Sequence, residues 1–179
     1  MKRVLVISSS LRQRSNSEAL ADAFARGAAD AGHEVEQITL REKDIRFCRG
    51  CLACQKTRRC VIQDDAPAVV ERMHDAEVIA FATPIYYYEM SGQLKTLLDR
   101  ANPLYASDYR FREVYVLTAA AEEDASVPER AVAGICGWID CFGKARLAGS
   151  VFAGGVTGPG EIEGHPSLKL AYEMGRAIK

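Results

Sequence analysis

Three short apolar runs, rich in β-branched side chains, constrain the fold of this chain more than any other feature. They cover residues 4–7, 78–82 and 114–117. Runs of this length without polar alternation are typical of central strands in a parallel sheet, which is covered on both faces. Two segments that are more polar or interrupted by glycine, 34–40 and 147–152, fit the edges of the same sheet. We therefore expect five strands.

Helical patterns lie between and after these strands. Apolar residues recur every three or four positions in five segments, represented by Leu20, Phe24 and Ala28; Val69, Val70 and Met73; Leu94, Leu97 and Leu98; Ala131, Ile135, Trp138 and Phe142; and Ala171, Met174 and Ile178. Right-handed crossovers then place helices on both faces of a parallel sheet. The expected fold is α/β, a flavodoxin-like three-layer sandwich with strand order 2-1-3-4-5.

Composition excludes several classes of protein. The 179 residues carry a net charge of -1, unlike a general nucleic-acid binder, and contain no apolar run long enough for a membrane-spanning helix. The N-terminal segment is too short and polar for a signal peptide. We expect a single cytoplasmic domain over residues 1–179, with a cysteine-rich insertion at 46–62 and no nucleic-acid or membrane partner.

The loop after the first strand, residues 8–17, is rich in hydroxyl, amide and guanidinium groups and leads directly into a helix. Such a loop can cradle a phosphate with its side chains and the free N–H groups of the helix start. The alternative is an ordinary polar loop in which Asn16 or Ser17 caps the helix. The loop lacks both the Walker pattern and GxGxxG. A later glycine-rich stretch, 154–160, fits either a flexible active-site or interface loop or an ordinary long turn.

The loop after the third strand, residues 83–92, contains three consecutive tyrosines. Because three such rings are hard to bury together in a short loop, at least one is expected to meet a planar ligand or a partner subunit. A core or dimer contact is the alternative interpretation. The position of this loop opposite the phosphate loop favours ligand contact.

Four of the six cysteines, Cys48, Cys51, Cys54 and Cys60, fall within thirteen residues. Four thiolates at this spacing can ligate a [4Fe-4S] cluster. Structural zinc, a redox-active CxxC pair and a set of free thiols remain alternatives. Residues 41–60 hold seven basic and two acidic residues, a local charge of +5 that favours thiolates, an anionic cluster or a passing NADPH phosphate. Cys136 and Cys141 are better explained by core packing.

Other polar residues give weaker signals. His33, His74 and His165 lie in separate segments without a neighbouring nucleophile, so we expect surface or capping roles. Lys95, Asp99 and Arg100 fit either a contact with the ligand or a neighbouring subunit, or a salt-bridged helix surface.

The phosphate loop, with Ser9-Ser10-Leu11-Arg12 and Ser15-Asn16-Ser17, resembles the GSxRxxSN loop of the NADPH-dependent FMN reductase family. Thr83-Pro84-Ile85-Tyr86 with Met90-Ser91-Gly92 resembles the TPxY...SG flavin loop of that family. The resemblance implies that the FMN phosphate is held by Ser10, Arg12, Ser15, Asn16 and Ser17. It implies that the isoalloxazine is wrapped by Pro84, Ile85, Tyr86, Tyr87, Met90, Ser91 and Gly92, with the segment from Thr118 to Ala121 at its pyrimidine edge.

Together with these loops, the cysteine spacing resembles the iron-sulfur flavoproteins. That resemblance implies an FMN-dependent oxidoreductase in which electrons pass between FMN and a [4Fe-4S] cluster on Cys48, Cys51, Cys54 and Cys60. It also implies a homodimer or homotetramer, NAD(P)H as a donor, and a quinone, dioxygen, peroxide or ferredoxin as redox partner. The alternatives are an NAD(P)H-dependent FMN or quinone reductase without a cluster, a non-catalytic FMN electron carrier, and a zinc-stabilised or thiol-based sensor.

Overall fold

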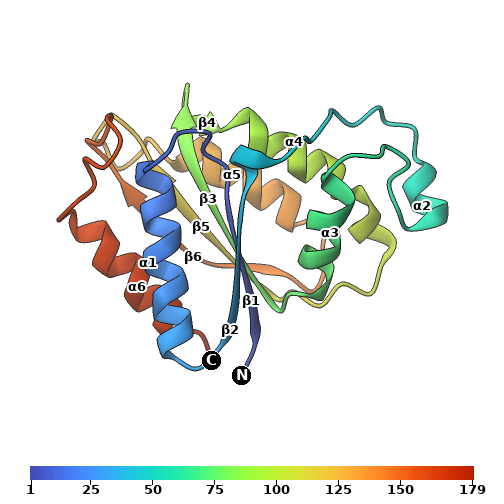
Figure 1. The fold of residues 1–179 in the computed structure, drawn as a ribbon, viewed down its shortest axis with the longest axis horizontal. Coiled ribbons are helices and arrows are strands. Elements are labelled where there is room, and N and C mark those ends of the chain that lie inside the picture. Colours follow the sequence, from blue (N-terminus) through green and yellow to red (C-terminus); the bar gives the residue numbers. More distant parts are fainter.

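The computed structural model describes residues 1–179 and contains one mixed sheet at its centre (Figure 1). Its parallel strands are β1 (Arg3–Ser8), β2 (Glu34–Thr39), β3 (Val78–Tyr86), β5 (Glu113–Ala119) and β6 (Arg146–Ala153). They are arranged in the order β2-β1-β3-β5-β6, which confirms the predicted flavodoxin-like order. A sixth strand, β4 (Glu89–Met90), pairs antiparallel with the end of β3 and was absent from the predicted five.

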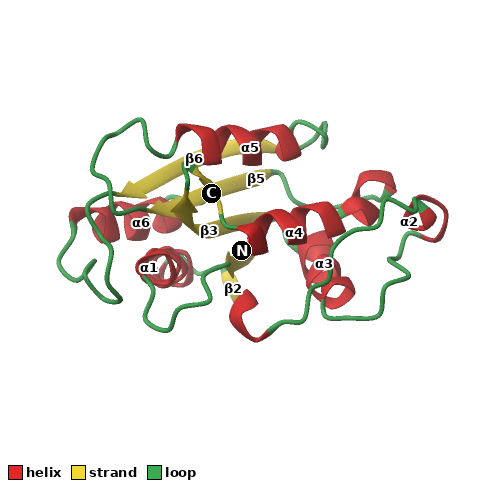
Figure 2. Cartoon of the chain, turned by 90° about the horizontal axis from the view of Figure 1, so that it is seen from above, coloured by secondary structure: helices red, strands yellow, loops and turns green.

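Five longer helices cover the two faces of the sheet, as the apolar spacing predicted (Figure 2). One face carries α1 (Asn16–Asp30) and α6 (Pro166–Arg176), and the other carries α3 (Ala66–Asp75), α4 (Gly92–Arg100) and α5 (Glu129–Ile139). Three short helical segments complete the fold: η1 (Leu40–Glu42), α2 (Ala53–Thr57) and η2 (Asn102–Ala106).

Strand β1 shows why both faces must be covered. Its side chains alternate between two cores, because Leu5 and Ile7 pack with α3, α4 and α5, whereas Val4 and Val6 pack with α1 and α6. All four are at most 2% exposed. Burying each such side chain contributes about 1.5–3 kcal/mol, so an uncovered face of the sheet would be unstable.

Helices α1 and α6 approach each other closely through two glycines. A Cβ atom added at Gly27 would lie 2.0 Å from the Tyr172 carbonyl oxygen, and one added at Gly175 would lie 2.1 Å from the Phe24 carbonyl oxygen. The backbones of the two helices therefore meet directly. This contact anchors the second half of α1, the helix that follows the phosphate loop.

The parallel strands all end at one edge of the sheet, the upper edge in Figure 1. The loops after β1, β3, β5 and β6 lie along this edge. The cysteine-rich connection runs from η1 to α3 and extends to one side of the sheet, where α2 lies (Figure 1). No helix in the structure combines the length and apolar character needed to cross a membrane.

Candidate flavin and cysteine sites

The phosphate loop between β1 and α1 presents buried hydroxyl groups at a helix start. Ser10, Ser15 and Ser17 are at most 5% exposed. The Ser15 side chain caps α1 by accepting a hydrogen bond from the Glu18 N–H (3.1 Å). The Ser17 hydroxyl is buried and has no hydrogen-bond partner. An unpartnered buried hydroxyl among free helical N–H groups fits an anionic ligand such as a phosphate.

A pocket of about 160 Å³ unites the phosphate loop with three other loops. All five predicted phosphate residues and three predicted flavin residues line it, together with part of the loop after β5 and part of the glycine-rich loop after β6. These residues are Ser10, Arg12, Ser15, Asn16, Ser17, Pro84, Ile85, Tyr86, Ala119, Ala120, Ala121, Val156, Thr157 and Pro159. The donor set fits FMN, because hydroxyl and guanidinium groups occupy one part of the lining and apolar or aromatic groups another.

Arg12 and Asn16 are engaged with the glycine-rich loop. The Arg12 guanidinium donates to the Thr157 carbonyl (2.9 Å). The Asn16 amide donates to the Gly158 carbonyl (3.0 Å) and accepts from the Ile162 N–H (3.2 Å). The glycine-rich stretch therefore forms a wall of the pocket, and its role as an active-site loop stays a prediction.

The β3–β4 hairpin places three tyrosines in different surroundings. Tyr87 and Tyr88 form its tip with φ values of 51° and 66°, in the left-handed region that side chains other than glycine rarely adopt. Tyr87 is 99% exposed, so nothing in this chain covers its ring. The Tyr88 hydroxyl donates to the Glu122 carboxylate (3.0 Å), which links the hairpin to the loop after β5.

The remaining predicted flavin residues lie beside the pocket rather than in its lining. Ser91 is buried, caps α4 through the Leu94 N–H, and donates to the Ser9 hydroxyl (2.8 Å). Met90 is buried against α5 at Gly134. Gly92 is exposed at the first position of α4. The buried Thr118 hydroxyl donates to the Val151 carbonyl (3.2 Å) in the sheet. Their roles toward the flavin stay predictions.

The four clustered cysteines line one cavity of about 480 Å³. Cys54 is buried, Cys60 is half-buried, and Cys48 and Cys51 are exposed. Two sulfur atoms accept hydrogen bonds: Cys54 Sγ from the Asn102 amide (3.0 Å) and Cys48 Sγ from the Gly50 N–H (3.4 Å). Donors of this kind stabilise thiolates, so the chemistry of the set suits a metal or an iron-sulfur cluster.

The sulfur atoms do not converge in this conformation. No group of three or more Cys, His, Asp or Glu side chains lies close enough together to hold a metal ion. The cavity also contains a fifth cysteine, Cys141, which is exposed. The expectation that Cys141 packs in the core is therefore wrong. It lies just beyond the end of α5 and outside the apolar stripe, whose last member, the neighbouring Phe142, remains in the core.

An ion pair that the sequence did not reveal closes the cysteine-rich connection. The side chains of Arg100 and Asp64 are fully buried, and the guanidinium donates to both carboxylate oxygens (2.6 and 2.8 Å). Arg100 also donates to the Arg46 carbonyl (2.6 Å). Burial alone would raise the pKa of Asp64, but hydrogen bonds from Arg100 and from two backbone N–H groups outweigh it and lower that pKa. We call this pair and its backbone contacts the Arg100 clamp.

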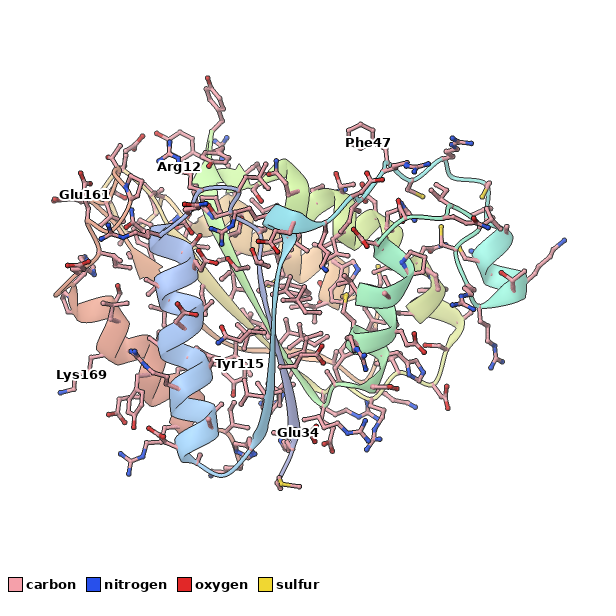
Figure 3. The ribbon with its side chains drawn as sticks, in the orientation of Figure 1. Arg12, Glu34, Phe47, Tyr115, Glu161 and Lys169 are labelled. Atoms are coloured by element: carbon pink, nitrogen blue, oxygen red, sulfur yellow. The ribbon has the colours of Figure 1, made fainter.

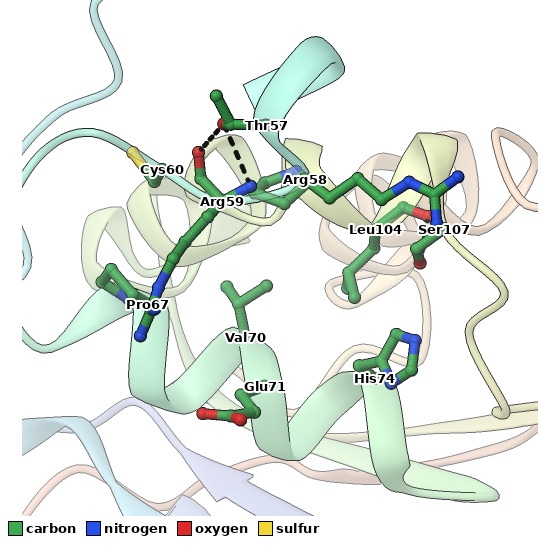
Figure 4. A pocket seen from close by; sticks show the side chains of 11 residues that line it. Thr57, Arg58, Arg59, Cys60, Pro67, Val70, Glu71, His74, Leu104 and Ser107 are labelled. Carbon is green, nitrogen blue, oxygen red and sulfur yellow. Dashed lines mark hydrogen bonds between the residues drawn. The ribbon is translucent and has the colours of Figure 1, made fainter. Parts of the chain in front are cut away.

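A second cavity lies under the cysteine-rich connection, between α2, α3 and η2 (Figure 4). His74 borders it and contacts the carboxylates of Asp75 (2.9 Å) and Asp108 (3.2 Å). The hydrogen bond with Asp75 is the main reason that the pKa of His74 is raised, with Asp108 contributing. His33 and His165 are likewise engaged with backbone or hydroxyl groups, and His165 caps α6. The surface or capping roles expected for the histidines agree with these contacts.

Comparison with known proteins gives the following matches. Residues 2–153 match the NADPH-dependent FMN reductase family. An iron-sulfur flavoprotein of Methanocaldococcus jannaschii is 35% identical over 102 residues, covering 57% of this chain and 53% of that protein. An iron-sulfur flavoprotein of Archaeoglobus fulgidus is 27% identical over 178 residues, covering 99% of this chain and 79% of that protein. The chain thus spans about half the length of the first relative.

Solved structures share the fold at low identity. An NAD(P)H:quinone oxidoreductase from Methanothermobacter marburgensis superimposes with a TM-score of 0.74 at 18% identity, covering 99% of both chains. The Trp repressor binding protein from Bacillus subtilis superimposes with a TM-score of 0.71 at 22% identity, again over 99% of both chains. The family match covers most of the sequence and confirms the resemblance carried by the phosphate and flavin loops. The chain belongs to the NADPH-dependent FMN reductase family, a family of flavin-dependent oxidoreductases.

Proposed function

We propose that this chain binds FMN at the carboxyl edge of its sheet and passes electrons between FMN and a [4Fe-4S] cluster held by Cys48, Cys51, Cys54 and Cys60. The observation that carries the flavin site is the Ser17 hydroxyl, which is buried without a partner beside the pocket formed by the loops after β1, β3, β5 and β6. FMN supplies the redox chemistry when bound, and the protein supplies binding, orientation and tuning.

The chain's own groups divide the work of binding. Ser10, Ser15 and Ser17, with the N–H groups at the start of α1, hold the phosphate. Pro84, Ile85 and Tyr86 form the apolar side of the pocket, where a planar ring packs. We expect no proton-transfer residue of the protein to be needed at this site, because the flavin carries the chemistry.

The cluster proposal is supported by the cysteine set and its surroundings. Four thiols line one cavity, two of the sulfur atoms accept N–H hydrogen bonds, and residues 41–60 carry a charge of +5. An anionic thiolate cluster is favoured in such surroundings. The relatives in Methanocaldococcus jannaschii and Archaeoglobus fulgidus are named iron-sulfur flavoproteins. Cluster ligation requires the four sulfur atoms to come closer together than they are in this conformation.

One observation favours a second function. Because no three candidate ligands converge, the chain also fits an NAD(P)H-dependent FMN or quinone reductase without a cluster. Quinone, dioxygen, peroxide and ferredoxin are the proposed classes of redox partner, and the assembly is proposed to be a homodimer or homotetramer. Measuring steady-state oxidation of NAD(P)H distinguishes both of these enzymes, with or without a cluster, from a non-catalytic FMN electron carrier.

The decisive experiment is the visible spectrum of protein purified without oxygen, with iron and acid-labile sulfide measured on the same sample. Both flavin and iron-sulfur absorbance are expected. Cys54→Ala is expected to remove the iron-sulfur absorbance and leave FMN bound. Cys141→Ala is the matched control, because Cys141 borders the same cavity but lies outside the four-cysteine set. A wild-type flavin spectrum with no iron would refute the cluster and support the second function.

A further inference from the structure

The loop after β6, residues 154–164, closes the candidate FMN pocket at its phosphate end. We call this segment the closing loop. All of it lies beyond residue 153, where the family match ends. Val156, Thr157 and Pro159 from this loop line the same pocket as the phosphate loop. The closing loop is therefore a part of the site that the family resemblance does not assign.

Two sets of contacts hold the closing loop in place. At its base, the Gly155 N–H donates to the Glu122 carbonyl (3.2 Å) and the Val156 N–H donates to the Ala120 carbonyl (2.9 Å). A Cβ atom at Gly154 would lie 2.8 Å from the Glu122 carbonyl oxygen, so the two backbones are in direct contact. The base is thus anchored to the loop after β5.

The tip of the closing loop is tied to the phosphate loop. The Arg12 guanidinium reaches the Thr157 carbonyl, and the Asn16 amide reaches both the Gly158 carbonyl and the Ile162 N–H. The turn at the tip is kept in shape by the Glu161 carboxylate, which accepts a hydrogen bond from the Thr157 N–H (2.7 Å). Figure 3 shows Glu161 and Arg12 on neighbouring segments above α1.

We propose that the closing loop determines the choice between flavins, accepting FMN, which ends in a phosphomonoester, and rejecting FAD, which continues from that phosphate to a second phosphate and an adenosine. This inference rests on the proposed FMN site. Arg12 and Asn16, which are expected at the FMN phosphate, also tie down the loop, so a longer ligand can leave the pocket only after the Arg12–Thr157 and Asn16–Gly158 hydrogen bonds break. Losing two net hydrogen bonds corresponds to roughly thirtyfold in the dissociation constant.

The test is a pair of titrations of flavin-free full-length protein, one with FMN and one with FAD, followed by quenching of flavin fluorescence. Wild type is expected to bind FMN roughly thirtyfold more tightly than FAD. Glu161→Ala, which releases the turn, is expected to reduce this ratio below about fivefold, chiefly through tighter binding of FAD. Glu161→Gln keeps an acceptor for the Thr157 N–H and is expected to retain the wild-type ratio.

Glu163→Ala is the matched control. It truncates the same side-chain type two residues away, but its partner is the exposed Arg14 outside the pocket (3.3 Å), so the ratio is expected to stay at the wild-type value. Equal affinity of wild type for both flavins, or an unchanged ratio in Glu161→Ala, overturns this inference while the FMN site stands. Absence of any flavin binding by wild type refutes the proposed function itself, and the inference with it.

Discussion

Replacing Arg100 by Ala is expected to lower the free energy of unfolding by about 3–5 kcal/mol, because it leaves the buried Asp64 carboxylate without its counter-ion. Both side chains are fully buried and joined by two hydrogen bonds of 2.6 and 2.8 Å. The substitution also removes the bond to the Arg46 carbonyl and the weaker contact with the Ile62 carbonyl (3.4 Å). These carbonyls lie at opposite ends of the cysteine-rich connection, so the variant also loses the clamp on that segment.

The assay is equilibrium unfolding in urea under reducing conditions, followed by fluorescence. The single tryptophan, Trp138, reports on the core because it packs against Phe142, at 4.6 Å between ring centroids, and against Phe111. Lys95→Ala is the control on the same helix. It removes an exposed ion pair with Asp99 and is expected to change stability by less than about 0.5 kcal/mol.

Arg100→Lys separates charge from geometry. Lysine keeps the positive charge but cannot donate the paired hydrogen bonds to Asp64 while also reaching the Arg46 carbonyl. We expect a loss of stability between those of the alanine variant and the control. A loss below about 1 kcal/mol in Arg100→Ala would refute the reasoning, because it would mean that water or a shifted side chain compensates the buried carboxylate.

Three further outcomes are expected. Ser17→Ala should leave the urea midpoint unchanged or slightly raised, because the Ser17 hydroxyl is buried without a partner. The same variant should weaken FMN binding roughly tenfold or more in titrations. Ser8→Ala removes a similar buried hydroxyl outside the pocket lining and should leave the affinity for FMN unchanged. Gly27→Ala should lower stability by about 3 kcal/mol through its backbone clash, whereas Gly137→Ala, which meets nothing within 4 Å, should raise it by about 0.5–1 kcal/mol, both measured in urea. Folding lowers the pKa of Asp64, so its contribution to the free energy of unfolding is complete above the unfolded pKa of 3.8 and is lost as the pH falls through the folded pKa. Asp64→Asn should therefore lack this loss when the free energy of unfolding is measured in urea between pH 5 and about 2.

Local patterns were enough to predict the sheet and its covering helices. Central strands such as β1 are buried on both faces, so their sequences are continuously apolar and stand out from their neighbours. The extension of β3 beyond Ala82 was not predictable in this way, because Thr83-Pro84 reads as the start of a loop. In the structure Pro84 still pairs in register with Ala119 of β5, and the hairpin to β4 follows.

Contacts between distant segments account for what the sequence did not reveal. For Arg100 the sequence left open a contact with a ligand or a neighbouring subunit and a salt-bridged helix surface, and Asp64 stands just before α3 in the chain. Their pairing depends on α4 ending where the cysteine-rich connection returns to the sheet. The role of the closing loop was equally hidden, since its bonds to Arg12 and Asn16 join residues about 145 positions apart.

Helix α4 relates the two candidate sites to each other. At its start, Ser91 caps the helix and bonds to Ser9 in the phosphate loop, and at its last residue Arg100 holds the cysteine-rich connection. A rise of 1.5 Å per residue places the ends of this nine-residue helix roughly 12–14 Å apart. The separation between the sites is therefore set by one helix, which packs on the sheet through Leu94, Leu97 and Leu98, rather than by the loops that carry the ligands. It follows that freeing the cysteine-rich connection at Arg100 should leave the Ser91 end, and with it flavin binding, intact in the folded fraction of the protein. If flavin affinity fell in parallel with the release of the cysteines, the two sites would instead be coupled through the loops.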